Sequence, residues 1–129
     1  MVILDTHVLV WLQSEPRRVS KTARGAFERA QKRNEVAISA FTLYELASYF
    51  ERGKLRRRES IESTIRLFVE GSIIKAITPE IAALAVEFPQ DFPRDPGDRI
   101  IAATARVENV PLITADERIR ACKLIKTIW

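Results

Sequence analysis

The chain has 129 residues, of which 47% are hydrophobic and 29% charged, with a formal net charge of +4. This length suits one domain with a buried core, and the composition and short apolar runs exclude a disordered or membrane-spanning chain. One cysteine and one histidine exclude an internal disulfide and a zinc cluster, while the mild positive charge permits a nucleic-acid partner without requiring one.

The first half of the chain is predicted to alternate strands and helices. The predicted elements are a strand at 2–4, a helix opened by Thr6, a break at 14–18 containing Pro16, a helix from Ser20 to about 33, a strand at 36–38 and a helix at 40–50. Residues 1–5 lack a basic start, and Asp5 interrupts the apolar stretch that a secretion signal needs. The expected location is therefore the cytoplasm.

The second half continues the alternation. Its predicted elements are a helix at about 60–70, a strand at 73–77, a helix near 79–87, a proline-containing loop at 88–96, an alanine-rich helix at 99–108, a strand at 111–113, a short helix at 116–121 and a strand at 124–128. Strands joined through helices pair in parallel. We therefore expect one α/β domain over residues 1–129, with three layers (α/β/α) and a mainly parallel central sheet.

Four acidic residues lie where such a sheet would gather them. Asp5 directly follows the first strand, and Asp116 comes three residues after Ile113. Glu45 lies in the first turns of the helix after the second strand, and Asp98 opens the alanine-rich helix. Since the carboxyl ends of parallel strands converge at one sheet edge, these carboxylates are predicted to meet there.

Each acid also has a purely structural explanation. Asp5 and Asp95 are suitable helix caps, and 42–45 fits a capping box that would account for Glu45. A capping box at 114–117 would use Glu117 as its acidic residue, so capping does not account for Asp116.

A cluster of carboxylates needs a cation, because the charges otherwise repel and raise one another's pKa. Oxygen ligands without histidine or cysteine favour a hard ion such as Mg²⁺ or Mn²⁺. An ion held in this way can activate water and stabilise the charge that develops on a phosphodiester. The pattern therefore indicates metal-dependent hydrolysis of a phosphate ester.

Four segments of the chain resemble the PIN-domain nucleases, specifically the VapC-type toxins of toxin–antitoxin pairs. The matching segments are 2–7 (VILDTH), 39–47 (SAFTLYELA), 95–105 (DPGDRIIAATA) and 112–116 (LITAD). They occur in the order and at the spacing of that family, and the resemblance covers essentially the whole chain.

The resemblance implies a PIN fold and a Mg²⁺- or Mn²⁺-dependent endoribonuclease that is inhibited by a small cognate antitoxin and usually forms a homodimer. It assigns the acidic positions to Asp5, Glu45, Asp98 and Asp116. Of these, Asp5 and Asp98 are the expected direct metal ligands, while the other two bind through water or orient the nucleophile. Thr114 is the expected hydroxyl partner.

Several neighbouring residues have two possible roles. Asp95 is mainly a helix cap beside the site, and Arg99 either contacts phosphate or, as we favour, pairs with a carboxylate. His7 is assigned a surface or structural role. The basic run 52–58 is either a solvated connection or a surface that guides RNA.

Other protein classes fit the sequence less well. A haloacid-dehalogenase phosphatase would need an acid at position 7, where this chain has histidine, and a response-regulator receiver would need adjacent acids near its first strand. The four glycines form neither GxGxxG nor GxxxxGK, which argues against a nucleotide-binding loop. The remaining alternative is a PIN-like module that binds RNA or protein without catalysis.

Overall fold

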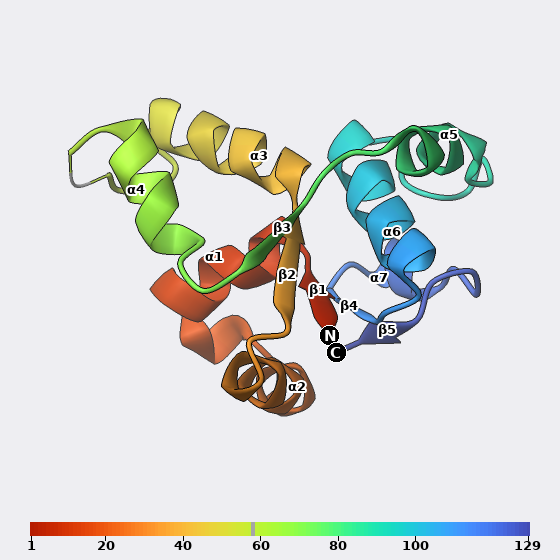
Figure 1. The fold of residues 1–129 in the computed structure, drawn as a ribbon, viewed down its shortest axis with the longest axis horizontal. Coiled ribbons are helices and arrows are strands. Elements are labelled where there is room, and N and C mark those ends of the chain that lie inside the picture. Colours follow the sequence, from red (N-terminus) through yellow and green to blue (C-terminus); the bar gives the residue numbers. More distant parts are fainter. Residues whose placement is uncertain (58) are drawn as a thin grey trace.

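The structure is a computed structural model that describes residues 1–57 and 59–129, so Arg58 of the basic run lies outside the described residues. Figure 1 shows its elements, which are β1 (Val2–Leu4), α1 (Thr6–Ser14), the 3₁₀ helix η1 (Pro16–Arg18), α2 (Lys21–Lys32), β2 (Val36–Ser39), α3 (Ala40–Glu51), α4 (Ile61–Phe68), β3 (Ile73–Lys75), α5 (Pro79–Glu87), α6 (Pro96–Glu108), β4 (Leu112–Ile113), α7 (Glu117–Arg120) and β5 (Thr127–Ile128). The predicted order of strands and helices is confirmed.

The five strands form one sheet in the order β3-β2-β1-β4-β5, and every neighbouring pair is parallel. The first strand is therefore central, with Ile3 opposite Ala37 on one side and Leu112 on the other. The predicted parallel sheet is confirmed. Its carboxyl edge gathers the residues that follow β1, β2 and β4.

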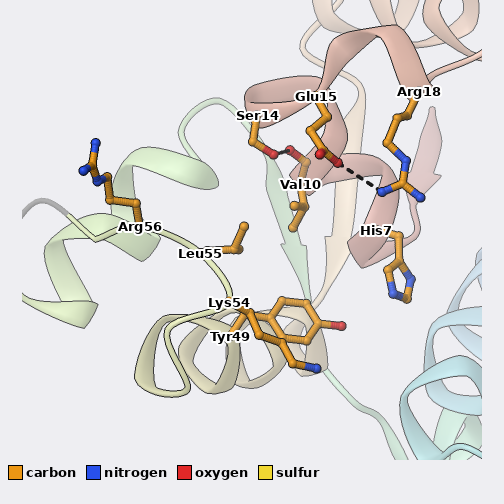
Figure 2. A pocket seen from close by; sticks show the side chains of 9 residues that line it. All are labelled: His7, Val10, Ser14, Glu15, Arg18, Tyr49, Lys54, Leu55 and Arg56. Carbon is orange, nitrogen blue, oxygen red and sulfur yellow. Dashed lines mark hydrogen bonds and ion pairs between the residues drawn. The ribbon is translucent and has the colours of Figure 1, made fainter.

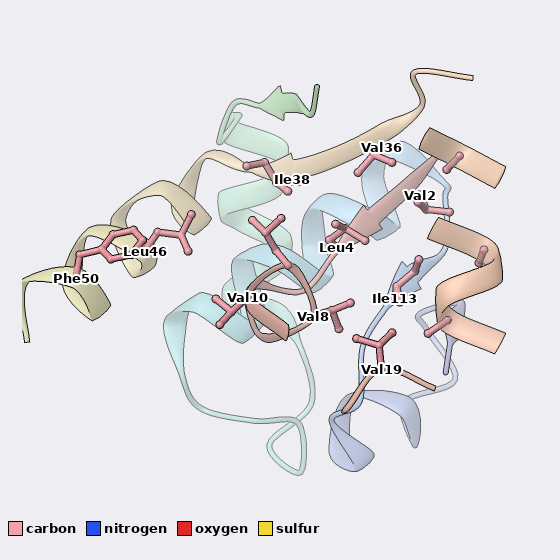
Figure 3. Packing of buried hydrophobic residues seen from close by; sticks show 14 residues of the cluster. Val2, Leu4, Val8, Val10, Val19, Val36, Ile38, Leu46, Phe50 and Ile113 are labelled. Atoms are coloured by element: carbon pink, nitrogen blue, oxygen red, sulfur yellow. The ribbon is translucent and has the colours of Figure 1, made fainter. Parts of the chain in front are cut away.

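Helices cover both faces of the sheet because successive strand residues point to opposite sides. Val2 and Leu4 pack with the apolar side chains of α1 and α2, as Figure 3 shows, whereas Ile3 packs with α5 and α6. Two buried cores therefore lie on either side of the sheet, and the predicted three-layer α/β/α architecture is confirmed (Figure 1).

Some element boundaries differ from the prediction. The helix α6 begins at Pro96 rather than at 99, because Asp95 caps it and proline is well suited to the first helical position. The strand β5 contains only Thr127–Ile128, and the predicted break at 14–18 contains η1. Gly53 and Gly71, which follow α3 and α4, both adopt positive φ angles that favour glycine.

Within the described part of the chain, no helix has both the length and the apolar character needed to cross a bilayer.

Candidate metal and active site

Asp5 lies at the carboxyl end of the central strand and is nearly buried, with 4% of its surface exposed. Its Oδ2 accepts a hydrogen bond of 2.7 Å from the hydroxyl of Thr114, which follows β4. Its Oδ1 lies 3.8 Å from Nδ1 of His7. The predicted partnership of Asp5 and Thr114 is present, and it fixes the direction of the carboxylate.

Asp116 has a structural role that the sequence interpretation missed. Its Oδ1 accepts hydrogen bonds from the backbone N–H groups of Arg118 (2.9 Å) and Ile119 (3.0 Å), so Asp116 is the N-cap of α7. The prediction that capping does not account for Asp116 is therefore wrong. A cap at Thr114 would require the helix to begin at residue 115, but α7 begins at Glu117. The Thr114 hydroxyl instead accepts a 3.1 Å hydrogen bond from the N–H of Asp116 and donates its own proton to Asp5.

Glu45 reaches the same edge from the second turn of α3. Its Oε1 accepts a 2.7 Å hydrogen bond from the hydroxyl of Thr6, and the Thr6 and Thr42 hydroxyls are 3.0 Å apart. The capping box predicted at 42–45 is wrong, because Ser39 caps α3 by accepting from the N–H of Phe41. Glu45 is therefore free of any capping role and is directed toward the site.

Asp95 and Asp98 come from the start of α6. Oδ1 of Asp95 accepts from the N–H of Asp98 at 3.1 Å, which confirms the predicted cap. A Cβ atom at Gly97 would lie only 2.9 Å from Oε2 of Glu45 and 3.0 Å from Oδ1 of Asp95. The glycine thus allows these carboxylates to approach the start of the helix closely. A cleft of about 420 Å³ is lined by Glu45, Asp95 and Asp98 together with His7 and Tyr49.

The carboxylates affect one another's titration. Burial, followed by the charges of Asp5, Asp95, Asp116 and Glu45, raises the pKa of Asp98 from 3.8 to about 7. Burial also raises the pKa of Glu45, and the hydrogen bond from Thr6 partly opposes that shift. Among the described residues, no lysine or arginine forms an ion pair with Asp5, Glu45 or Asp98. Negative charge is thus concentrated on carboxylates that have no lysine or arginine ion-pair partner in this part of the chain, while His7 lies beside Asp5 and Arg52 and Lys54 line the same cleft.

The donor chemistry fits a hard divalent cation. Among the described residues, no three acidic, histidine or cysteine side chains are grouped so that they could hold a metal ion together. Mg²⁺ does not need such a group, because it keeps several waters and is commonly bound by one or two carboxylates. The buried Asp5 and the half-buried Asp98 are the pair available to such an ion, and burial followed by the charge of Asp5 raises the pKa of Asp98.

Arg99 does not form the carboxylate pair that the sequence analysis favoured. Its guanidinium donates to four backbone carbonyls, those of Ala85 (3.1 Å), Phe88 (3.3 Å), Pro89 (3.4 Å) and Pro93 (2.8 Å). The favoured pairing with a carboxylate is therefore wrong. The carbonyls at the end of α5 and in the loop lack helical partners, and they bind the cation more effectively than a distant carboxylate does.

His7 is 57% exposed and stands over the cleft beside Tyr49, at a ring-centroid separation of 6.4 Å. The interaction with the Asp5 carboxylate raises the pKa of His7 against the opposing effect of partial burial. The exposure agrees with the surface role predicted for His7.

The sequence interpretation missed the buried pair Thr6 and Thr42. Both follow neighbouring parallel strands, Thr6 two residues after β1 ends and Thr42 three residues after β2 ends. That spacing is the signal that could have identified them. Gly97 was likewise read as part of a helix start, although its lack of a side chain makes room for Glu45.

Comparison with known proteins agrees with this geometry. Residues 2–123 match the family model of the PIN domain. Ribonuclease VapC22 of Mycobacterium tuberculosis (strain ATCC 25618 / H37Rv) is 37% identical over 130 residues, covering 99% of this chain and 98% of that protein.

Solved structures share the fold. VapBC2 of Rickettsia felis, crystallised with a DNA fragment from its promoter, gives a TM-score of 0.74 at 20% identity over 98% of this chain and 97% of the other. A toxin–antitoxin complex from Klebsiella pneumoniae gives a TM-score of 0.70 at 25% identity over 97% and 95% of the two chains.

Proposed function

Because this chain belongs to the VapC-type branch of the PIN-domain family, we propose that it is a metal-dependent endoribonuclease that acts as the toxin of a type II toxin–antitoxin pair. The relative in Mycobacterium tuberculosis is named a ribonuclease, and the chain from Klebsiella pneumoniae belongs to a toxin–antitoxin complex. The observation that carries the proposal is the group of carboxylates at the sheet edge, none of which forms an ion pair with a described lysine or arginine.

Asp5 and Asp98 would hold Mg²⁺ or Mn²⁺. Their oxygens are hard ligands, and the high pKa of Asp98 reflects burial first and then neighbouring negative charge, which a cation would neutralise. Such an ion, when bound, supplies positive charge to the phosphodiester and lowers the pKa of water.

The remaining residues hold the site in shape and handle protons. Thr114 orients Asp5 through its 2.7 Å hydrogen bond, and Thr6 orients Glu45 in the same way. We assign Glu45 to orienting the attacking water and accepting its proton, since burial raises its pKa and makes it a stronger base than an exposed glutamate. Asp116 uses Oδ1 as a helix cap, which leaves Oδ2 for a contact through water.

The partners follow from the same family membership. We propose RNA as the substrate, a small cognate antitoxin as the inhibitor, a homodimer as the assembly and the cytoplasm as the place of action. We therefore expect the protein to arrest growth when it is expressed alone, and the product of a neighbouring small reading frame to restore growth.

Cleavage of RNA with Mg²⁺ or Mn²⁺ tests the proposal. We expect Asp5→Asn and Asp98→Asn each to lower the rate by at least about 100-fold, since even substitutions outside the ligand set cost roughly 10–100-fold at metal sites. Chelation with EDTA should have the same effect on the parent.

Glu28→Gln is the matched control, because Glu28 is an exposed acid on α2. Its rate should equal that of the parent. Cleavage that survives both aspartate substitutions contradicts the metal site, and RNA binding without any cleavage favours the non-catalytic binding module.

A further inference from the structure

A second cavity continues the acidic cleft on the far side of His7. It has a volume of about 550 Å³ and shares His7, Tyr49 and Lys54 with the cleft that contains Glu45 and Asp98. Volumes of roughly 300–1,000 Å³ are typical of ligand sites. The two cavities therefore form one continuous groove.

The second cavity has basic walls and an apolar floor. Figure 2 shows His7 and Arg18 on the side of α1 and η1, and Tyr49 and Lys54 on the opposite side, at the end of α3. Arg56 follows Leu55 in the chain and lies beyond it in the picture, and the buried Val10 and the half-buried Leu55 lie between the walls. The charge of the groove thus changes from acidic at Asp98 to basic at Arg18 and Arg56.

The cations of this cavity are available to a ligand. Lys54 and Arg56 are exposed and form no ion pair with a described residue. Arg18 is paired with Glu15 at 3.0 Å, but both side chains are more than half exposed, so the pair contributes little and can exchange for a phosphate. The guanidinium of Arg18 also lies 4.1 Å from the centre of the Trp11 ring, which holds it at the rim.

Resting on the proposed ribonuclease function, we propose that this cavity binds the single-stranded RNA segment adjacent to the cleaved bond. Phosphates bind Lys54, Arg56 and Arg18, and one unstacked base lies against the apolar floor beside the Tyr49 ring. The arrangement combines the two requirements of single-strand binding, which are a basic path for the backbone and an apolar or aromatic surface for a base.

The apolar floor and the basic walls of the cavity explain why a single strand fits better than a duplex. A base can reach Val10 and Leu55 only when it is unpaired and turned away from its neighbours, whereas in a duplex the faces of the bases are stacked inside the helix. The acidic half of the groove repels phosphate without a cation, so the basic half provides the attraction that brings the strand to Asp5 and Asp98.

The test is a binding measurement that needs neither metal nor cleavage. A labelled single-stranded RNA of about 12 nucleotides, within the roughly 4–16 that such sites cover, is titrated by fluorescence anisotropy in EDTA. We compare the parent with Lys54→Ala/Arg56→Ala. Loss of two phosphate contacts should weaken binding about tenfold near 0.15 M salt and reduce the slope of log K against log salt by about 1.4.

Arg29→Ala/Arg33→Ala is the matched control, since it removes the same charge from exposed positions of α2 and its C-cap, beside Met1 and Glu35 at the amino end of the sheet. Its affinity should stay within about twofold of the parent. A third titration uses the same sequence as a duplex, for which Lys54→Ala/Arg56→Ala should cost less than for the single strand.

The possible outcomes separate the explanations. Equal losses in the groove and control variants mean that only overall charge matters, which overturns the subsite. Unchanged RNA binding in the groove variant also overturns it and leaves the cavity to a protein partner. If the parent cleaves no RNA but the groove variant still loses single-strand binding, the proposed catalysis fails and the binding subsite stands.

Discussion

The hydroxyl of Thr6 has only one proton, and its use determines how Glu45 is held. Thr6 is buried and donates to Oε1 of Glu45, so Thr42 must be the donor in the 3.0 Å contact between the two hydroxyls. The result is a directed chain from Thr42 through Thr6 to Glu45. The hydrogen bond stabilises the ionised carboxylate and keeps its pKa from rising further.

We expect Thr6→Val to lower kcat by about 10–100-fold with little change in KM, because the valine preserves volume but cannot orient Glu45. The acid limb of the pH–rate profile should move to higher pH, since Glu45 loses the bond that lowers its pKa. Thr6→Ser keeps the hydroxyl, so its kcat and the acid limb of its pH–rate profile should match those of the parent.

Thr64→Val is the control for burying valine in place of a threonine. Thr64 is also buried, but it lies on α4 and donates to the carbonyl of Ser60. A pH profile for Thr6→Val that matches that of Thr64→Val would show that Thr6 does not position Glu45.

At the scale of elements, Arg99 ties α6 to the end of α5 and to the loop between them. The last carbonyls of a helix have no helical partners, and Arg99 satisfies those of Ala85 and Phe88 along with two proline carbonyls of the loop. Since Asp95 and Asp98 begin the same helix, the tie also holds the loop that leads into the acidic site.

Arg99→Ala should lower the free energy of unfolding by about 2 kcal/mol, because it leaves several carbonyls without their charged donor. Backbone amides of 88–95 should exchange hydrogen faster. Arg106→Ala is the comparison on the same helix, since exposed Arg106 donates to the single carbonyl of Leu124 at 2.7 Å. The free energy of unfolding is measured by urea denaturation. Equal losses in the two variants would show that the hydrogen bonds of Arg99 do not hold the loop in place.

The strand topology of the fold could be predicted from the sequence, but the hydrogen-bond partners of individual side chains could not. Strands joined by helices allow little besides a parallel sheet, and that sheet gathers Asp5, Glu45 and Asp116. The capping role of Asp116 depends on α7 beginning one residue later than predicted, and periodicity does not resolve such a shift. The partners of Arg99 are loop carbonyls, which leave no mark in the sequence.

The stability of the metal-free molecule should depend on pH through Asp98. Its folded pKa of about 7 lies above its ordinary 3.8, so the folded state binds more protons between these values and stability is lost as the pH rises through them. The melting temperature of the parent should therefore fall from about pH 5 to about pH 8, and Asp98→Asn should reduce that fall.

Mg²⁺ or Mn²⁺ should raise the melting temperature of the parent near pH 8 and raise that of Asp98→Asn less, because a ligand that binds the folded state stabilises it. Glu28→Gln again serves as the control and should follow the parent in both measurements. Identical pH curves for the parent and Asp98→Asn would show that Asp98 is not the group responsible.

The central position of β1 also governs when the site exists during synthesis. Asp5 is made early relative to its partner, because the hydroxyl that orients it belongs to Thr114, which is 109 positions further along the chain. Its backbone N–H likewise waits for the carbonyl of Ile113. The segment from Asp5 through Thr114 must therefore be synthesised before the Asp5 carboxylate acquires these partners, and a product that stops before β4 has Asp5, Glu45 and Asp98 but no assembled site.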